Sequence, residues 1–127
     1  MKKATTYLEK AKRAAINRDW EQADEALRTL ILVGEEEELQ TVVAALSLLA
    51  TDCEKLNLNE LALWAYKWVA QIAPGQIAAY VKLATHYERQ GQRQTALQWL
   101  QRGMELVVDR EEQEQLRRTY RRVASRN

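Results

Sequence analysis

Two pairs of alanines in the middle of the chain have the same spacing. Ala50 and Ala84 are 34 positions apart, and so are Ala62 and Ala96. The apolar residues around them recur every three or four positions, which places them on one face of an α-helix. A helical hairpin repeated at a fixed period cannot bury its apolar face alone, so it stacks on its neighbours. The spacing therefore predicts an all-α chain made of stacked helical hairpins.

The clearest hairpin covers residues 76–110 and turns at Gly91. Its first helix has an apolar stripe at Tyr80, Leu83, Ala84 and Tyr87, and its second helix has one at Ala96, Leu100, Gly103 and Val107. The small residues within these stripes allow a neighbouring helix to approach closely. With one Pro and four Gly in 127 residues, the chain has few turn signals, so we expect long helices with short connections.

An equivalent pattern precedes this hairpin, and a weaker one opens the chain. The preceding copy contains Leu46, Leu49, Ala50, Cys53, Ala62 and Tyr66, and it closes on Pro74. The weaker copy contains Tyr7, Lys10, Ala11, Ala14, Ala23 and Leu27, and it lies 39 positions before the second copy. The surplus over the regular spacing falls near 38–42, where we expect it to lengthen the third helix.

These residues and their period resemble the tetratricopeptide repeat (TPR). The resemblance rests on Tyr80, Leu83, Ala84 and Tyr87, followed by Gly91, Ala96 and Leu100, and on the proline that closes the preceding copy. It implies a right-handed α-solenoid of about seven helices, in a single domain over residues 1–127. The implied repeats cover about 4–37, 43–76 and 77–110, and a capping helix covers about 111–125. As in the family, a concave groove lined mainly by the first helix of each hairpin would bind a peptide or a partner helix.

Capping signals predict where the helices begin. The pairs are Thr6 with Glu9, Asp19 with Gln22, Asn57 with Glu60, and Asp109 with Glu112. Gly34 and Pro74 are the expected stops. Four consecutive glutamates at 35–38 suit the positive end of the dipole of the third helix, which we expect to reach about Leu56. The alternative interpretation of these glutamates is an acidic binding patch.

Nine positions face the groove that the resemblance implies. They are Leu8, Lys12, Ser47, Thr51, Lys55, Val81, Lys82, Thr85 and Arg89. Their charge is mostly positive, so a partner with an acidic segment or a C-terminal carboxylate would fit. The Lys and Asn pattern with which some members of the family clamp a terminal carboxylate is not matched, because Asn is missing at the corresponding positions. The alternative is that these are ordinary solvated positions.

Two tryptophans on the fourth helix form a second candidate surface. Trp64 and Trp68 are four residues apart and lie off the stripe of Ala62, Tyr66 and Val69. They predict an exposed apolar patch, and such a patch marks a docking site or a homodimer interface. The alternative is that they pack against the lengthened third helix. We expect Trp20 in the core.

A third candidate surface is the arginine-rich last helix, which has its apolar stripe at Leu116, Tyr120 and Val123. The anion patch consists of Arg117, Arg118, Arg121 and Arg122, which would form a phosphate-binding strip. No nucleic-acid motif accompanies it, and few aromatic residues lie between the arginines. We therefore expect a solvated face with ion pairs to Glu111, Glu112 and Glu114, and nucleic acid remains the alternative partner.

Catalysis has little support in the sequence. His86 is the only histidine and Cys53 the only cysteine, and neither belongs to a metal-ligand motif. We expect Cys53 in the core, His86 on the surface, no cofactor or metal, and no enzymatic activity. The formal net charge of +1, the lack of an apolar run of about 18 residues and the lack of a secretory signal predict a cytoplasmic protein with no membrane span.

The sequence thus predicts a non-catalytic interaction scaffold that acts as an adaptor, an assembly factor or a chaperone. A phosphate-binding or nucleic-acid-binding module is one alternative. A self-associating structural subunit, which would form a homodimer through Trp64 and Trp68, is the other.

Overall fold

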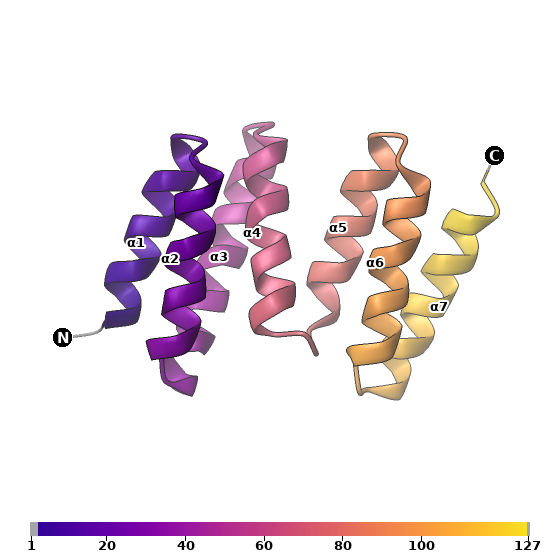
Figure 1. Cartoon of the computed structure of the whole chain (residues 1–127). Coiled ribbons are helices and arrows are strands. Elements are labelled where there is room, and N and C mark those ends of the chain that lie inside the picture. Colours follow the sequence, from indigo (N-terminus) through magenta and orange to yellow (C-terminus); the bar gives the residue numbers. More distant parts are fainter. Residues whose placement is uncertain (1–2, 127) are drawn as a thin grey trace. The chain divides into compact units, whose positions relative to one another are not determined.

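The computed structural model describes residues 3–126, and within that range it contains seven α-helices and no strand. Figure 1 shows the order of the helices and the short connections between them. Their bounds are α1 Lys3–Ile16, α2 Trp20–Val33, α3 Glu36–Lys55, α4 Asn59–Ile72, α5 Ile77–Arg89, α6 Arg93–Leu106 and α7 Arg110–Ala124. Neighbouring helices pack in pairs, as in helical-repeat solenoids, so the predicted all-α class is confirmed. None of the described helices is long and apolar enough to cross a membrane.

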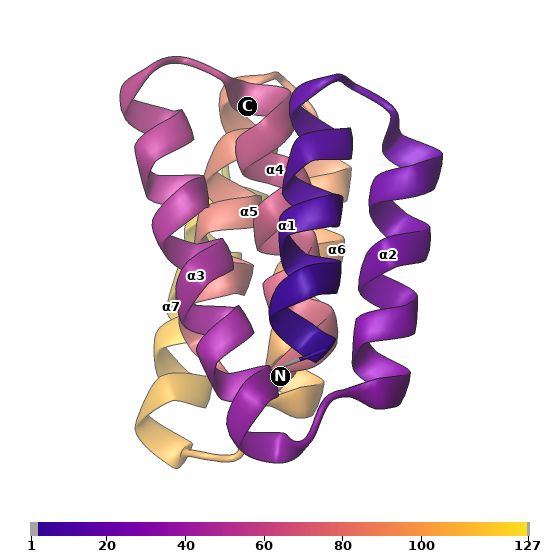
Figure 2. The same ribbon diagram turned by 90° about the vertical axis from the view of Figure 1, so that its left-hand side faces the viewer.

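The chain forms two compact units, Met1–Trp68 and Val69–Asn127, and the boundary between them falls within α4. In the first unit α1 packs against both α2 and α3, an arrangement that Figure 2 shows. In the second unit α6 packs against α5 and α7, and α5 also contacts α7. The single domain expected over residues 1–127 stays a prediction.

Three hairpin turns have the same backbone conformation. Arg18, Asn57 and Gly91, which follow α1, α3 and α5, have positive φ angles of 60°, 60° and 78°. A left-handed residue at this position ends a helix while the last carbonyls of the helix still receive hydrogen bonds. Arg18 and Asn57 are 39 positions apart, and Asn57 and Gly91 are 34 positions apart. These are the same intervals that separate the copies in the sequence. The hairpin repeat is therefore present in the backbone as well as in the sequence.

The three turns also share two backbone hydrogen bonds. The amide that follows the left-handed residue donates to a carbonyl five residues earlier: Asp19 to Ala14 (2.9 Å), Leu58 to Cys53 (2.8 Å) and Gln92 to Tyr87 (2.8 Å). The carbonyl of the donating residue then accepts from an alanine four residues later, which is Ala23, Ala62 or Ala96. These alanines are the markers of the three predicted copies, so the alignment of the copies is confirmed.

Two of the predicted capping pairs are confirmed. The side chain of Asp19 accepts from the amide of Gln22 (3.3 Å), and the side chain of Asp109 accepts from the amide of Glu112 (3.0 Å). Each bond satisfies one of the amides that the first helical turn leaves without a backbone partner. These caps fix the starts of α2 and α7.

The other two capping predictions are wrong. Thr6 lies inside α1, because the helix already includes Lys3 and the residues between them. Asn57 does not start α4. Its left-handed backbone makes it the residue that ends α3, and α4 begins at Asn59. The capping pattern with Glu60 is therefore coincidental.

The lengthening of the third helix is confirmed. α3 has 20 residues, whereas its counterpart α5 has 13. Because the turns that follow both helices align, the additional residues lie at the beginning of α3. There Glu35 and Glu38 form a capping box, and Gly34 ends α2 as predicted. The glutamate run at 35–38 thus has a structural role at the start of this helix.

The second unit is held together by a close approach of helices at Gly103. A Cβ atom added to this residue would lie 2.8 Å from Cγ of Tyr80 and 3.1 Å from Cδ1 of Leu116. The ring of Tyr80 is fully buried, and its hydroxyl donates to the backbone oxygen of Pro74 (2.6 Å). A glycine at this position therefore lets α5 and α7 pack closely on α6.

Candidate functional site

The groove residues of the first unit lie on α1 and α3, and they are not equally accessible. Leu8 is 6% exposed, so it belongs to the core and the prediction that it faces a groove is wrong. Lys12 pairs with Glu9 on the same helix (3.3 Å). On α3, the hydroxyl of Thr51 donates to the backbone oxygen of Ser47 (3.0 Å). Thr51 and Lys55 are exposed, whereas Ser47 and Lys12 are half-buried.

The groove residues of the second unit all lie on α5. Lys82 and Arg89 are exposed and seven residues apart, which is two helical turns, so they lie on one side of the helix. Val81 and Thr85 are half-buried, and the hydroxyl of Thr85 donates to the backbone oxygen of Val81 (2.8 Å). The polar groups of this surface are thus two cations beside a hydroxyl that is already engaged in its own helix.

The two tryptophans of α4 do not form an exposed patch. Trp64 is 7% exposed and Trp68 is half-buried. Both indole N–H groups donate to the same oxygen of Asp24 on α2, at 2.9 Å from Trp64 and 2.8 Å from Trp68. Trp20 is also half-buried, and its ring centroid lies 6.4 Å from that of Trp64. The indoles are therefore fastened to α2, which corrects the prediction of an exposed apolar patch.

The only histidine and the only cysteine of the chain are both buried. His86 is 5% exposed, which corrects the expectation of a surface position. Ala79, seven residues earlier on the same side of α5, is 1% exposed, so the buried arc of this helix is wider than the predicted stripe. Cys53 is 3% exposed as expected, and burial together with the charge of Asp52 raises the pKa of its thiol. A raised pKa disfavours the reactive thiolate.

One buried polar contact in the first unit involves Tyr66, whose hydroxyl donates to the carboxylate of Glu54. Burial and this hydrogen bond raise the pKa of Tyr66 to about 12. Tyr66 therefore holds its proton at neutral pH, and the contact ties α4 to α3. Across residues 3–126 no group of three or more His, Cys, Asp and Glu side chains could hold a metal ion.

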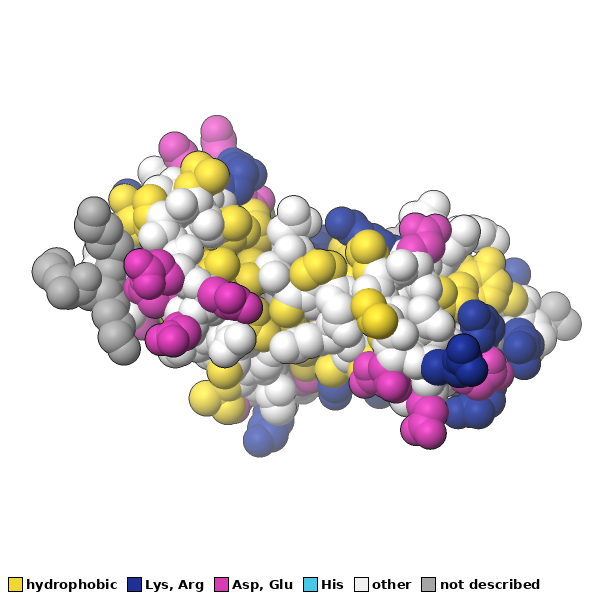
Figure 3. All heavy atoms as spheres, turned by 90° about the horizontal axis from the view of Figure 1, so that it is seen from below, with side chains coloured by type: hydrophobic (Ala, Val, Ile, Leu, Met, Phe, Trp, Pro, Cys, Tyr) yellow, Lys and Arg dark blue, Asp and Glu magenta, His cyan; other side chains and the backbone are white. Residues whose placement is uncertain are grey.

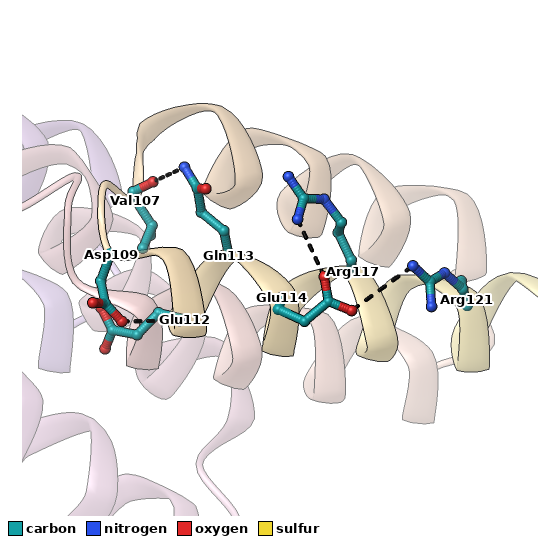
Figure 4. Close-up of polar contacts among 7 residues, drawn as sticks. All are labelled: Val107, Asp109, Glu112, Gln113, Glu114, Arg117 and Arg121. Atoms are coloured by element: carbon teal, nitrogen blue, oxygen red, sulfur yellow. Dashed lines mark hydrogen bonds and ion pairs between the residues drawn. The ribbon is translucent and has the colours of Figure 1, made fainter.

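The anion patch on α7 is partly neutralised by its own helix. Figure 4 shows the carboxylate of Glu114 between Arg117 (3.2 Å) and Arg121 (3.9 Å). Arg118 and Arg122 are exposed and have no ion-pair partner among the described residues. All four guanidinium groups are exposed as the anion-patch prediction requires, and the expected pairing to Glu114 is also present.

The start of α7 is fixed by two polar contacts, which Figure 4 also shows. Besides the Asp109 cap, the side chain of Gln113 donates to the backbone oxygen of Val107 (2.7 Å). Leu116 and Val123 are buried and Tyr120 is half-buried, so the predicted stripe faces the second unit. On the face seen in Figure 3, Lys and Arg side chains gather at the α7 end, with acidic side chains among them.

An apolar cleft in the first unit was missed by the sequence analysis. It has a volume of about 550 Å³ and lies where the α1–α2 turn and the α3–α4 turn come together. Leu49 and Cys53 line it from α3, Ile16 lines it from the end of α1, and Leu56 and Leu58 line it from the α3–α4 turn. A comparison of the three turn sequences would have found it, because only the second turn has leucines on both sides of its left-handed residue.

Comparisons with protein-family models, with curated proteins and with solved structures find no match to this chain.

Proposed function

We propose that this protein is a non-catalytic interaction scaffold that resembles a TPR array and binds a segment of a partner protein. The observation that carries this proposal is the repeated hairpin turn, with Arg18, Asn57 and Gly91 in one conformation at the spacings of the sequence copies. Stacked hairpins of this kind hold their surface side chains in fixed positions. A flexible partner would then bear most of the entropic cost of ordering on binding.

The α5 surface is the part of the predicted groove that best supports this role. Lys82 and Arg89 are exposed on one side of the helix. They lie beside the half-buried Val81 and Thr85, so an acidic segment with a small apolar side chain would complement this surface. In this proposal the cations select the partner and set its orientation, while contacts with the half-buried residues exclude water.

The test is a pull-down from the host lysate with the wild-type protein and with the Lys82→Glu, Arg89→Glu double variant. We expect a discrete protein to be captured by the wild type at moderate salt and lost in the variant. The control is Lys10→Glu with Arg28→Glu, which makes the same change in charge at exposed positions on α1 and α2. Capture that is equal for all three proteins would exclude the α5 surface as the binding site.

A second candidate function is binding of phosphate groups through the anion patch on α7. The specific observation in its favour is that Arg118 and Arg122 are exposed, four residues apart and without an ion-pair partner among residues 3–126. Neutralisation of several phosphates makes affinity fall steeply as salt rises. A nucleic-acid stain on the pull-down eluate at low and moderate salt separates the two functions, because only the phosphate-binding module should lose its ligand.

A further inference from the structure

The apolar cleft of the first unit is built from residues that the fold itself does not require. The three hairpin turns share one backbone conformation and the same hydrogen bonds, so the residues at equivalent positions can be compared directly. The positions on either side of the left-handed residue are Asn17 and Asp19 in the first turn and Gln90 and Gln92 in the third. In the second turn they are Leu56 and Leu58. Polar residues therefore suffice to form this turn.

The leucines of the second turn are also unfavourable for stability where they stand. Leu58 precedes α4 at the position where Asp19 precedes α2. The Asp19 side chain accepts from a first-turn amide, and a leucine cannot. Leu56 is 69% exposed and Leu58 is 42% exposed. Neither cap strength nor core packing therefore explains the choice of leucine.

The exposed leucines continue an apolar surface that extends across the cleft. Ile16, at the end of α1, is 62% exposed and lines the opposite side. Leu49 and Cys53 line the cleft from α3. Three large aliphatic side chains around a concave apolar site form the kind of exposed patch that marks an interface. A single aliphatic side chain of a partner could enter it.

The charges around the cleft indicate what accompanies that side chain. Arg18 of the α1–α2 turn and Glu60 at the start of α4 form an ion pair (3.0 Å) and neutralise each other. Asp52 also lines the cleft, and its carboxylate has no hydrogen-bond or ion-pair partner among the described residues. The nearest cation on its own helix, Lys55, does not line the cleft. The cleft therefore has an uncompensated negative charge at its edge, which a basic residue of the partner would complement.

We propose that the cleft between the α1–α2 and α3–α4 turns is a docking site for a protein segment that places a large aliphatic side chain beside a Lys or Arg. Leu56, Leu58 and Ile16 surround the aliphatic side chain, and Asp52 pairs with the basic residue. The proposal extends the scaffold function to a second partner surface. It rests on residues other than Lys82 and Arg89, so failure of one site leaves the other testable.

The test uses synthetic amphipathic helical peptides in place of the unknown partner. One peptide is made of leucine and lysine, a second of leucine and glutamate, and a third of serine and lysine. Binding is measured by fluorescence anisotropy, and amide chemical shifts locate the site on the wild-type protein. We expect only the leucine–lysine peptide to bind, with shift changes concentrated at residues 16–18 and 52–61. Shift changes elsewhere, or equal binding of the leucine–glutamate peptide, would overturn the proposal.

Variants of the second turn test the residues themselves. Leu56→Gln with Leu58→Gln gives this turn the polar residues of the third turn, so the fold should be retained, and circular dichroism checks this. We expect the affinity for the leucine–lysine peptide to fall at least about tenfold, because burial of apolar side chains is lost. Asp52→Asn should remove the preference for lysine over glutamate. Leu32→Gln, at a residue that is 84% exposed on α2 and does not line the cleft, is the control and should bind normally.

A second copy of the chain is the competing occupant. Light scattering over a range of concentrations distinguishes it from a heterologous partner. A dimer that dissociates in the Leu56→Gln, Leu58→Gln variant but persists in Leu32→Gln would assign the cleft to self-association and overturn the assignment to a basic partner. A monomer in all three proteins supports it.

Discussion

Replacement of Asp24 should destabilise the first unit, because one carboxylate oxygen holds two tryptophans. Asp24→Ala removes the acceptor of the indole N–H groups of Trp64 and Trp68, which donate at 2.9 and 2.8 Å. A hydrogen bond to a charged group contributes about 1.5–3 kcal/mol. Trp64 is 7% exposed, so its donor would be left unpaired, whereas water can reach the half-buried Trp68. We therefore expect a loss of about 2–4 kcal/mol in the free energy of unfolding.

The assay can be made specific for the first unit. Trp20, Trp64 and Trp68 belong to this unit, whereas Trp99 belongs to the second. Urea unfolding followed by tryptophan fluorescence in a Trp99→Phe background therefore reports the first unit alone. Asp24→Asn keeps an acceptor oxygen without the charge. It should cost about half as much as alanine, because charge-assisted hydrogen bonds are roughly twice as strong as neutral ones.

A double-mutant cycle separates the hydrogen bonds from other effects of the substitution. In a Trp64→Phe, Trp68→Phe background the indole donors are absent, and Trp20 remains as the reporter. In this background Asp24→Ala should lower the free energy of unfolding by less than about 1 kcal/mol, since the indole N–H groups that pair with Asp24 are absent. An equal loss in both backgrounds would show that Asp24 acts through something other than the two indoles, and the reasoning would be refuted.

Three further predictions concern the backbone, the helix packing and a buried hydroxyl. Gly91→Ala should cost about 1–2 kcal/mol, because φ is 78° while no atom lies within 4 Å of the new methyl group; Gly75→Ala, equally uncrowded, is the control for thermal unfolding and should change little. Gly103→Ala should also destabilise the fold, because overpacking costs about 1–3 kcal/mol, whereas the better helix propensity of alanine offsets at most about 1 kcal/mol; an unchanged melting temperature would contradict the close approach to Tyr80. The pKa of Tyr66 lies above its ordinary value of 10.0, at about 12, so its contribution to stability is complete below pH 10 and is lost as pH rises towards 12. Ultraviolet titration of wild type against Tyr66→Phe checks this: both proteins should have the same amplitude near pH 10, and the variant should lose one tyrosine from the later transition, to which Tyr80 with its raised pKa does not add a difference; a smaller amplitude near pH 10 in the variant would contradict it.

The hairpin alignment could be predicted from the sequence because it depends on local signals. A left-handed turn residue, a following alanine and the apolar spacing all lie within one hairpin. Their repetition at a constant interval made Ala62 and Ala96 recognisable as equivalent positions. The longer interval back to Ala23 correctly placed the additional length at the start of α3. The turn residue, the alanine and the apolar spacing each indicate the same hairpin. Such agreement between local preference and fold makes a prediction from sequence possible.

The predictions that failed depended on contacts between helices. His86 lies beside the apolar stripe of α5, yet it is buried, as is Ala79 seven residues earlier on the same side of the helix. Trp64 and Trp68 also lie off the stripe, but Asp24, far earlier in the chain on α2, pairs with their N–H groups. A stripe counted along one helix describes one contact face. It cannot describe a helix with neighbours on two sides, or a polar contact made across so many residues.

The apolar cleft has a second unfavourable feature besides the exposed Leu56 and Leu58, namely the backbone conformation of Arg18. Glycine adopts a positive φ angle without strain, and Gly91 supplies it in the third turn, but Arg18 has a φ of 60° in the first. A non-glycine residue in this conformation costs about 1 kcal/mol or more. The Arg18–Glu60 ion pair does not offset this strain, because its side chains are 64% and 67% exposed and such pairs contribute little. A strained arginine and two exposed leucines thus line the same cleft, whereas the third turn has glycine and glutamine at the equivalent positions. Unfavourable residues thus occur together at the cleft, and the equivalent third turn lacks them. Such clustering is expected if the cleft is the proposed docking site.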